Sequence, residues 1–336
     1  MSFHFRKVNI MIQIVLLALI FFSYVNGATP SVSRLEKITF YSPSLRIDKS
    51  FNIYLPKGYD NGNKKYPVLY LFRGHEDEWR DRGNIKEIAD ELISKGFMGE
   101  MIIIMPGLTF GENFVGFPVN LIETSSAKEN AIIGSGRFED FIINDLIPYV
   151  DENFRTIAVR SARAVDGFSA GAFSTLFLAL RHPELFCSIG SYDGNLGYLD
   201  FNDPSIKGAF DDSIYMFLSL FDPYFGNPRN MEYMKQCNPS NIIEAATPEQ
   251  LDIIKEMKFF IRSACETAKS AYIEGSYYPR VKQFVELMAA RGIMNYWRDD
   301  LVMSLNADHN WADAKVYIKS TLPLHWNEFS KNIQVK

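Results

Sequence analysis

The pattern of apolar positions predicts strands that alternate with helices along most of the chain. Short, unbroken apolar runs at Val68–Phe72, Met101–Met105 and Phe186–Ser191 are typical of strands buried on both faces. Apolar residues at helical spacing over Ile85–Ser94 and within 134–153 predict helices between these strands. This alternation is typical of a mostly parallel sheet with helices on both of its faces.

The same pattern predicts further elements towards both ends of the chain. They are strands over Ile38–Tyr41, Phe51–Leu55, Phe259–Ser263 and Met294–Leu301, and helices over Pro279–Arg291 and Trp311–Leu322. Residues 193–258 interrupt the alternation and are rich in aromatic side chains, which predicts an inserted lid above the ligand site. Since the sequence contains no repeat, low-complexity run or linker, we expect residues 28–336 to form one domain.

One short motif carries the candidate chemistry. Gly167-Phe168-Ser169-Ala170-Gly171 has the pattern G-x-S-x-G, in which a sharp turn from strand to helix presents a serine above the sheet. The context supports this interpretation, because Arg163–Asp166 is typical of a short strand and Ala172–Arg181 of a helix. We therefore predict the α/β-hydrolase fold, with Ser169 as a nucleophile at the carboxyl end of a strand, where such sheets bind ligands.

A serine nucleophile needs a base within hydrogen-bond reach, and the base needs an orienting acid. In this fold the three residues follow one another as serine, acid and histidine. His182 lies at the far end of the helix that follows Ser169, and His325 is expected to be a surface or packing residue. His309 follows the last predicted strand, so it is the predicted base.

The acid is expected after the strand at 259–263. Glu266 is the best-placed candidate, and Glu274 is the alternative. Asp308 is a poor partner for His309, because neighbouring residues in an extended loop point apart.

An ester hydrolase also needs N–H groups that meet the oxyanion of the tetrahedral intermediate. The backbone N–H of Ala170 is one predicted donor, and the loop after Val68–Phe72 offers Gly74 and His75 for the other. A substrate-binding role for the His75 ring stays open. Trp79 and Trp311 are close in sequence to the two site loops and are predicted to line the substrate pocket.

Composition narrows the range of partners and cofactors. Apolar residues make up 47% of the 336 residues, the formal net charge is −5, and no stripe of lysine and arginine predicts nucleic-acid binding. The spacing of Cys187, Cys237 and Cys265 fits no zinc pattern, so neither a metal nor an organic cofactor is expected. A disulfide between Cys237 and Cys265 remains open.

The first residues are typical of a signal peptide rather than of the fold. Arg6 and Lys7 precede the apolar run Ile14–Phe22, and Val25-Asn26-Gly27 suits cleavage before Ala28. We expect residues 1–27 to be removed and the product to be periplasmic or extracellular, without a stable membrane anchor. An uncleaved anchor is the alternative, although the apolar run is short for a membrane span.

Together the segments resemble the esterase D / feruloyl esterase-like family of α/β-hydrolases, which also includes enterochelin esterases, S-formylglutathione hydrolases and mycolyltransferases. The resemblance covers about residues 36–330. The matching segments are 51–59, 66–74, 101–106, 138–148, the serine motif, 182–186 and His309-Asn310-Trp311. It implies a serine triad with Ser169 as nucleophile, His309 as base and an acid near Glu266.

The chain departs from the family pattern at three positions. Arg73 stands where the family usually has histidine, and Ala172 replaces a glycine after the serine motif. The segment Ser263-Ala264-Cys265-Glu266 replaces the usual Gly-x-x-Asp, which bears on the acid.

These observations favour an exported serine esterase that acts on a small-molecule or oligosaccharide ester, with feruloyl or acetyl esters of carbohydrates as the expected substrates. Two alternatives are an acyltransferase with a sugar or lipid acceptor and a non-catalytic binding protein on the same scaffold.

Overall fold

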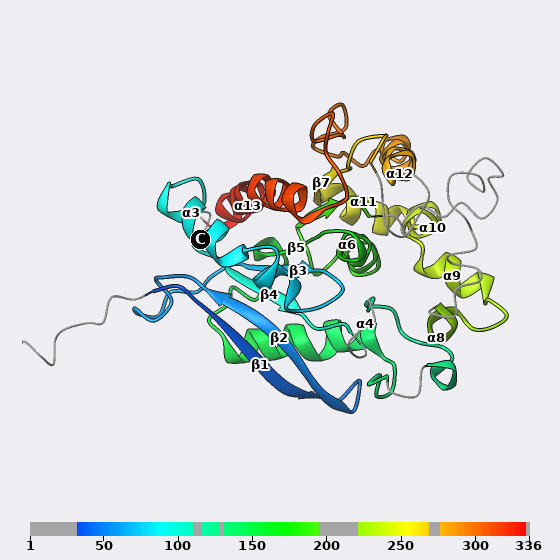
Figure 1. The fold of residues 1–336 in the computed structure, drawn as a ribbon, viewed down its shortest axis with the longest axis horizontal. Coiled ribbons are helices and arrows are strands. Elements are labelled where there is room, and N and C mark those ends of the chain that lie inside the picture. Colours follow the sequence, from blue (N-terminus) through cyan, green and yellow to red (C-terminus); the bar gives the residue numbers. More distant parts are fainter. Residues whose placement is uncertain (1–31, 110–115, 128–130, 195–220, 269–275, 334–336) are drawn as a thin grey trace, which may run out of the picture.

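A seven-stranded sheet forms the centre of the computed structural model, which describes residues 32–109, 116–127, 131–194, 221–268 and 276–333 (Figure 1). The strands lie in the order β1-β2-β4-β3-β5-β6-β7. Their bounds are β1 Arg34–Ser42, β2 Ile47–Leu55, β3 Val68–Phe72, β4 Ile102–Pro106, β5 Arg163–Gly167, β6 Ser188–Tyr192 and β7 Lys258–Arg262. β1 and β2 pair antiparallel, β2 also pairs antiparallel with β4, and the remaining neighbours are parallel. The expected mostly parallel sheet is therefore confirmed.

The central strands are apolar throughout because both faces of the sheet are covered. On β3, Val68 and Tyr70 pack into one hydrophobic cluster, whereas Leu69 and Leu71 pack into a second. All four side chains are at most 1% exposed. Since successive side chains of a strand point to opposite faces, this alternation shows that each face has a core of its own.

Helices divide between these two faces (Figure 1). One face is covered by α2 Glu78–Asp81, α3 Ile85–Ser94 and α13 Trp311–Ile333. The other is covered by α4 Phe138–Asp140, the π-helical η2 Phe141–Leu146, α5 Ile147–Asn153, α6 Ala170–Arg181 and α12 Tyr278–Ala290. Short 3₁₀ turns lie at η1 Thr124–Ser126 and η3 Arg160–Ala162. Across the residues that the structure describes, none of the helices is long and apolar enough to cross a membrane.

The predicted lid segment lies between β6 and β7. Its described part consists of α8 Asp222–Phe225, α9 Met231–Cys237, α10 Pro239–Ala245 and α11 Pro248–Glu256. Tyr224 and Phe225 are buried in the same cluster as α6, so these aromatic side chains serve packing. Residues 195–220 of the predicted lid, and the predicted signal peptide, lie outside the described residues.

Two predicted elements differ in the structure. The segment Met294–Leu301 is not a strand. Only single bridges form here, between Asn295 and Phe259 of β7 and between Val302 and Ser263 directly after β7. The Asn295 side chain accepts from the Ile261 N–H at 2.9 Å and donates to the Ile261 carbonyl at 3.1 Å, so a side chain substitutes for backbone pairing. α13 continues past Pro323 to Ile333, because apolar residues such as Phe329 remain buried beyond the proline.

The three cysteines are free thiols, so the pairing of Cys237 with Cys265 that the sequence left open does not occur in this structure. Burial raises the pKa of the Cys187 and Cys237 thiols to about 12. Neither thiol is therefore a reactive thiolate near neutral pH.

Candidate active site

The serine motif forms the predicted turn between β5 and α6. Ser169 has φ 60° and ψ −118°, a conformation that side chains rarely adopt and that presents the hydroxyl at the start of α6. The glycines allow this turn by close approach. A Cβ on Gly171 would lie 2.0 Å from the Phe72 carbonyl oxygen, and a Cβ on Gly167 would lie 2.5 Å from the Gly171 backbone.

His309 contacts the serine as predicted. Its Nε2 lies 2.9 Å from Ser169 Oγ, and its side chain is 7% exposed. The imidazole contacts two aromatic rings, with the centroids of Phe168 and Tyr277 each 4.8 Å from its own. These two contacts help to hold the ring in the orientation in which Nε2 faces the hydroxyl.

Asp193 is the carboxylate that contacts His309. Its Oδ2 lies 2.7 Å from His309 Nδ1, and the residue has no exposed surface. Its Oδ1 accepts from the Ser263 hydroxyl at 2.8 Å and from the Ala264 N–H at 2.9 Å. These two donors stabilise a buried charge and hold the carboxylate in the direction of the imidazole.

The structure does not bring the predicted acid to His309. Glu266 is exposed to solvent, whereas Asp193 occupies the contact with His309. Glu274 lies outside the described residues. The loop after β7 still takes part, because its residues Ser263 and Ala264 hold the carboxylate that β6 supplies.

Sequence reasoning missed Asp193 because it counted this residue as the start of the lid. The available signal was its position directly after an apolar strand that follows the serine motif, since neighbouring parallel strands end at the same edge of a sheet. The chain order of serine, acid and histidine is kept. Asp308 is turned away as expected, for its carboxylate accepts the His309 backbone N–H.

The predicted oxyanion donors differ in whether their N–H already donates to another group. Ala170 is the first residue of α6, so its N–H is among those that have no acceptor within the helix. The His75 N–H is already engaged, because it donates to the Glu78 carboxylate at 3.0 Å. Of the predicted pair after β3, the Gly74 amide is thus the better candidate, and the contact of Gly171 with Phe72 brings this loop against the serine turn.

The two tryptophans pack against each other beside the β3 loop and the serine turn. Trp79 is 1% exposed and donates its indole N–H to the Phe72 carbonyl at 2.9 Å, so the prediction that it lines a substrate pocket is wrong. Its ring packs edge-on against Trp311 at 5.1 Å. Trp311 is half-buried, and its pocket role stays a prediction.

Arg73 stands where the family usually has histidine, and its contacts explain this departure from the family pattern. Its guanidinium lies 5.0 Å over the ring of Phe168 and 5.6 Å over that of Trp311, as in a cation–π contact.

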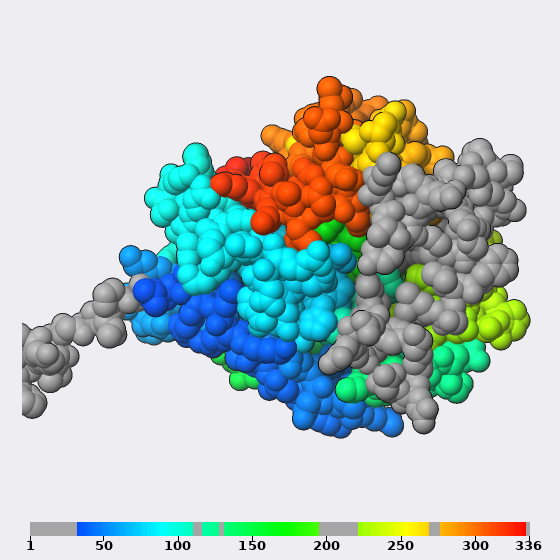
Figure 2. Space-filling view, in the orientation of Figure 1, coloured from blue at the N-terminus to red at the C-terminus, as the bar shows by residue number. Residues whose placement is uncertain are grey.

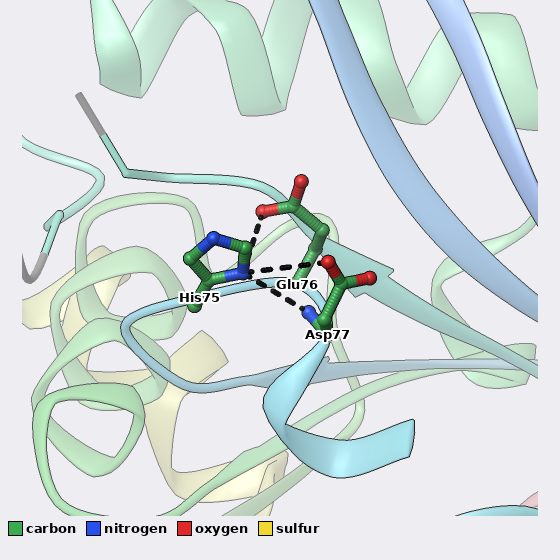
Figure 3. A group of neighbouring side chains, drawn as sticks. All are labelled: His75, Glu76 and Asp77. Carbon is green, nitrogen blue, oxygen red and sulfur yellow. Dashed lines mark hydrogen bonds and ion pairs between the residues drawn. The ribbon is translucent and has the colours of Figure 1, made fainter. Parts of the chain in front are cut away.

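A cluster of titratable side chains follows the oxyanion loop (Figure 3). One ligand atom from each of His75, Glu76 and Asp77 lies within 4.8 Å of the others, a spacing that a metal ion could use. The Lys37 ammonium lies 3.2 Å from Glu76 and 3.1 Å from Asp77, and Arg80 lies 2.8 Å from Asp77. Since two cations already balance these carboxylates, the cluster is explained as an ion-pair network at the start of α2.

Three segments that are distant in sequence meet at the surface near the serine turn. In Figure 2 a green patch, the colour of the chain that includes β5 and α6, is visible between cyan residues of the β3–α3 region and orange-red residues that lead into α13. These are the segments that carry the predicted nucleophile, the oxyanion loop and the base.

Comparison with known proteins finds an esterase family model that matches part of this chain. Residues 42–201 match the family model described as "Putative esterase". The chain is similar to an endo-1,4-beta-xylanase/feruloyl esterase of Xylanibacter ruminicola, with 35% identity over 168 residues that cover 48% of this chain and 21% of that protein. The chain thus spans about a fifth of the length of this curated relative.

Solved structures agree on the fold. A ferulic acid esterase superposes with a TM-score of 0.68 at 19% identity, covering 89% of this chain and 99% of that one. An S-formylglutathione hydrolase from Agrobacterium tumefaciens has a TM-score of 0.61 at 15% identity, covering 90% and 97%. The chain therefore has the α/β-hydrolase fold, and its residues 42–201 are similar to the esterase family model.

Proposed function

We propose that this protein is a serine carboxylic ester hydrolase in which Ser169, His309 and Asp193 form the catalytic triad. The observation that carries the proposal is the hydrogen-bonded chain from Ser169 Oγ to His309 Nε2 at 2.9 Å and from His309 Nδ1 to Asp193 at 2.7 Å. Nucleophile, base and orienting acid are the parts that activate a serine hydroxyl at neutral pH. This continuous chain argues against a non-catalytic binding protein.

Each residue has a separate task in the reaction. Ser169 Oγ attacks the ester carbonyl carbon while its proton passes to His309 Nε2. The bond to the alcohol then breaks, and His309 gives the proton to the departing oxygen, which leaves an acyl ester on Ser169. Water attacks this ester while its proton passes to His309 Nε2. The bond between the acyl carbon and Ser169 Oγ then breaks as His309 returns the proton to Oγ, and the carboxylic acid is released. Asp193 keeps a proton on Nδ1, so that Nε2 faces the serine as the acceptor.

The tetrahedral intermediates carry an oxyanion, for which we assign the Ala170 N–H as the first donor and the Gly74 amide as the second. The support for this assignment is the helix start at Ala170 and the contact of the β3 loop with the serine turn. Loss of one such donor typically costs about 10²–10³ in rate.

We propose feruloyl or acetyl esters of carbohydrates as the substrates. The support is the similarity to a protein named for xylanase and feruloyl esterase activities and the fold likeness to a ferulic acid esterase. Acyl transfer would use the same triad, and it is treated as an outcome of the experiment below.

We also propose that residues 1–27 direct export, that residues 28–336 act as a single unit, and that the product works in the periplasm or outside the cell. The support is the basic start, the apolar run Ile14–Phe22 and the small residues before Ala28. Export argues against S-formylglutathione as the substrate, because that thioester is cytosolic.

The test is hydrolysis of p-nitrophenyl acetate and methyl ferulate by the purified protein beside its Ser169→Ala variant. We expect the wild type to cleave both esters and the variant to be slower by about 10⁴-fold or more. An added alcohol acceptor reports the partition between hydrolysis and transfer, and a predominance of transfer product would assign an acyltransferase instead. A wild type that cleaves neither ester contradicts the proposed hydrolase.

A further inference from the structure

A second buried acid–histidine pair lies beneath the serine turn. Asp166 Oδ2 lies 3.1 Å from His325 Nε2, and neither residue has any exposed surface. The two residues are 159 positions apart in sequence. Asp166 belongs to β5, three residues before Ser169, and His325 belongs to α13. The triad proposed above does not use this pair.

The Asp166 carboxylate is held by directional hydrogen bonds. Oδ2 also accepts from the Thr321 hydroxyl at 2.7 Å, and Oδ1 accepts from the Gly167 N–H at 2.6 Å. Room for the group exists because Gly190 has no side chain, since a Cβ there would lie 2.1 Å from the carboxyl carbon. A carboxylate removed from water costs several kcal/mol unless it is partnered in this way.

The pair connects one helix to two strands of the sheet. While His325 Nε2 faces Asp166 on β5, its Nδ1 lies 2.6 Å from the Ser188 hydroxyl on β6.

The three elements that His325 connects also lie next to the triad residues in sequence. The carboxyl end of β5 leads to Ser169, and the carboxyl end of β6 leads to Asp193. α13 itself begins at Trp311, two residues after His309. A single imidazole thus connects the three segments from which the members of the triad come.

We propose that His325 and Asp166 are positioning residues that set the relative placement of Ser169, His309 and Asp193. This inference rests on the proposed esterase function. Apolar packing alone permits α13 to slide by fractions of an ångström over the sheet, whereas a hydrogen-bonded imidazole fixes the helix against β5 and β6 together. Since a misplacement of about 1 Å can cost roughly 10²-fold in rate, the pair acts on kcat more than on KM.

A second buried acid in the same protein provides the matched control. Glu139, which is 5% exposed, accepts from His182 Nε2 at 2.8 Å and from Arg181 at 2.7 Å. This network ties α4 to the far end of α6, and among the residues that the structure describes its hydrogen bonds reach neither β6 nor α13. We expect a break in this network to lower stability without moving the triad, so it separates a general loss of stability from a loss of positioning.

The experiment measures kcat and KM for methyl ferulate, and the rate at which a fluorophosphonate modifies Ser169, in His325→Leu, His325→Gln and Glu139→Gln. We expect His325→Leu to lower kcat and the modification rate by roughly 10- to 100-fold at unchanged KM. His325→Gln retains an N–H that can reach Asp166, so it is expected to recover most of the rate. Glu139→Gln is expected to lower the melting temperature and leave kcat unchanged.

Ser188→Ala removes one link and keeps the buried charge paired, so it serves if His325→Leu does not fold; we expect a several-fold loss of kcat. Folded variants of His325 or Ser188 with the kcat and modification rate of the wild type would overturn the inference. A rate loss in Glu139→Gln as large as that in the His325 and Ser188 variants would also overturn the inference. Failure of the proposed function is distinguishable, because the wild type itself would then hydrolyse no ester, while the fluorophosphonate rate would still report the geometry around Ser169.

Discussion

Asp193 Oδ2 lies 2.7 Å from His309 Nδ1, although the two residues are 116 positions apart in sequence. The carboxylate follows β6, and its second oxygen accepts from Ser263 and Ala264 directly after β7. The acid thus comes from one strand and is oriented by the end of the next strand in the sheet.

This arrangement predicts the effect of a change at Ser263. Ser263→Ala removes the hydroxyl that donates to Asp193 Oδ1 at 2.8 Å and leaves the Ala264 N–H in place. Because a hydrogen bond to a charged group contributes about 1.5–3 kcal/mol, we expect kcat/KM to fall by at least about 10-fold. Steady-state kinetics on p-nitrophenyl acetate measure this, and an unchanged kcat/KM would show that the Ala264 N–H alone orients the acid.

Gly171→Ala is expected to abolish activity. The added Cβ would lie 2.0 Å from the Phe72 carbonyl oxygen, a contact that requires the serine turn and the end of β3 to separate. The oxyanion donors lie on those two segments in our assignment. Esterase activity and the melting temperature of the purified variant measure the effect. A fully active variant would contradict the assigned oxyanion site.

Trp79→Phe separates the structural role of this residue from the pocket role predicted from the sequence. The change removes the indole N–H that donates to Phe72 and part of the packing against Trp311. We expect the free energy of unfolding to fall by about 1–3 kcal/mol, with KM for methyl ferulate unchanged. Urea unfolding and steady-state kinetics measure the two quantities, and a raised KM at unchanged stability would restore the pocket role.

The environment of Glu139 predicts that part of the free energy of unfolding is lost in acid. Burial by itself raises the pKa of this carboxyl, but hydrogen bonds from His182 and Arg181 outweigh it and bring the pKa below its ordinary value of 4.5. The stabilisation is therefore present above pH 4.5 and is lost as the pH falls through the lowered pKa. We expect Glu139→Gln to reduce the free energy of unfolding at neutral pH and to flatten its decline in acid. Equal slopes for both proteins between pH 5 and pH 3 (roughly the window of this titration) would count against this account.

The central strands and the helix α3 could be predicted from the sequence because burial on two faces, or on one helical face, leaves a local signature. β3 spans Val68–Phe72 and α3 spans Ile85–Ser94, as the apolar pattern predicts. Met294–Leu301 has a similar pattern and is not a strand, because the pairing depends on the Asn295 side chain and its distant partner Ile261.

The candidate site could be predicted where the chemistry is local. The serine turn is contained in five consecutive residues, and His309 follows from the order of elements. Asp193 was missed because its role depends on which strand ends beside β5. His325 could not be assigned because its buried partner Asp166 lies on a strand that is 159 positions away in sequence. Spatial neighbours of this kind have no spacing rule in the sequence.

The identity of the acid tests the account most directly. We would measure kcat/KM for p-nitrophenyl acetate in Asp193→Asn and Glu266→Gln beside the wild type. Asn at 193 cannot hold the imidazole in the active tautomer, so we predict a loss of about 10³–10⁴-fold, whereas Glu266→Gln, at an exposed position, retains wild-type activity. Wild-type activity in Asp193→Asn, or a comparable loss in Glu266→Gln, would contradict the triad of Ser169, His309 and Asp193.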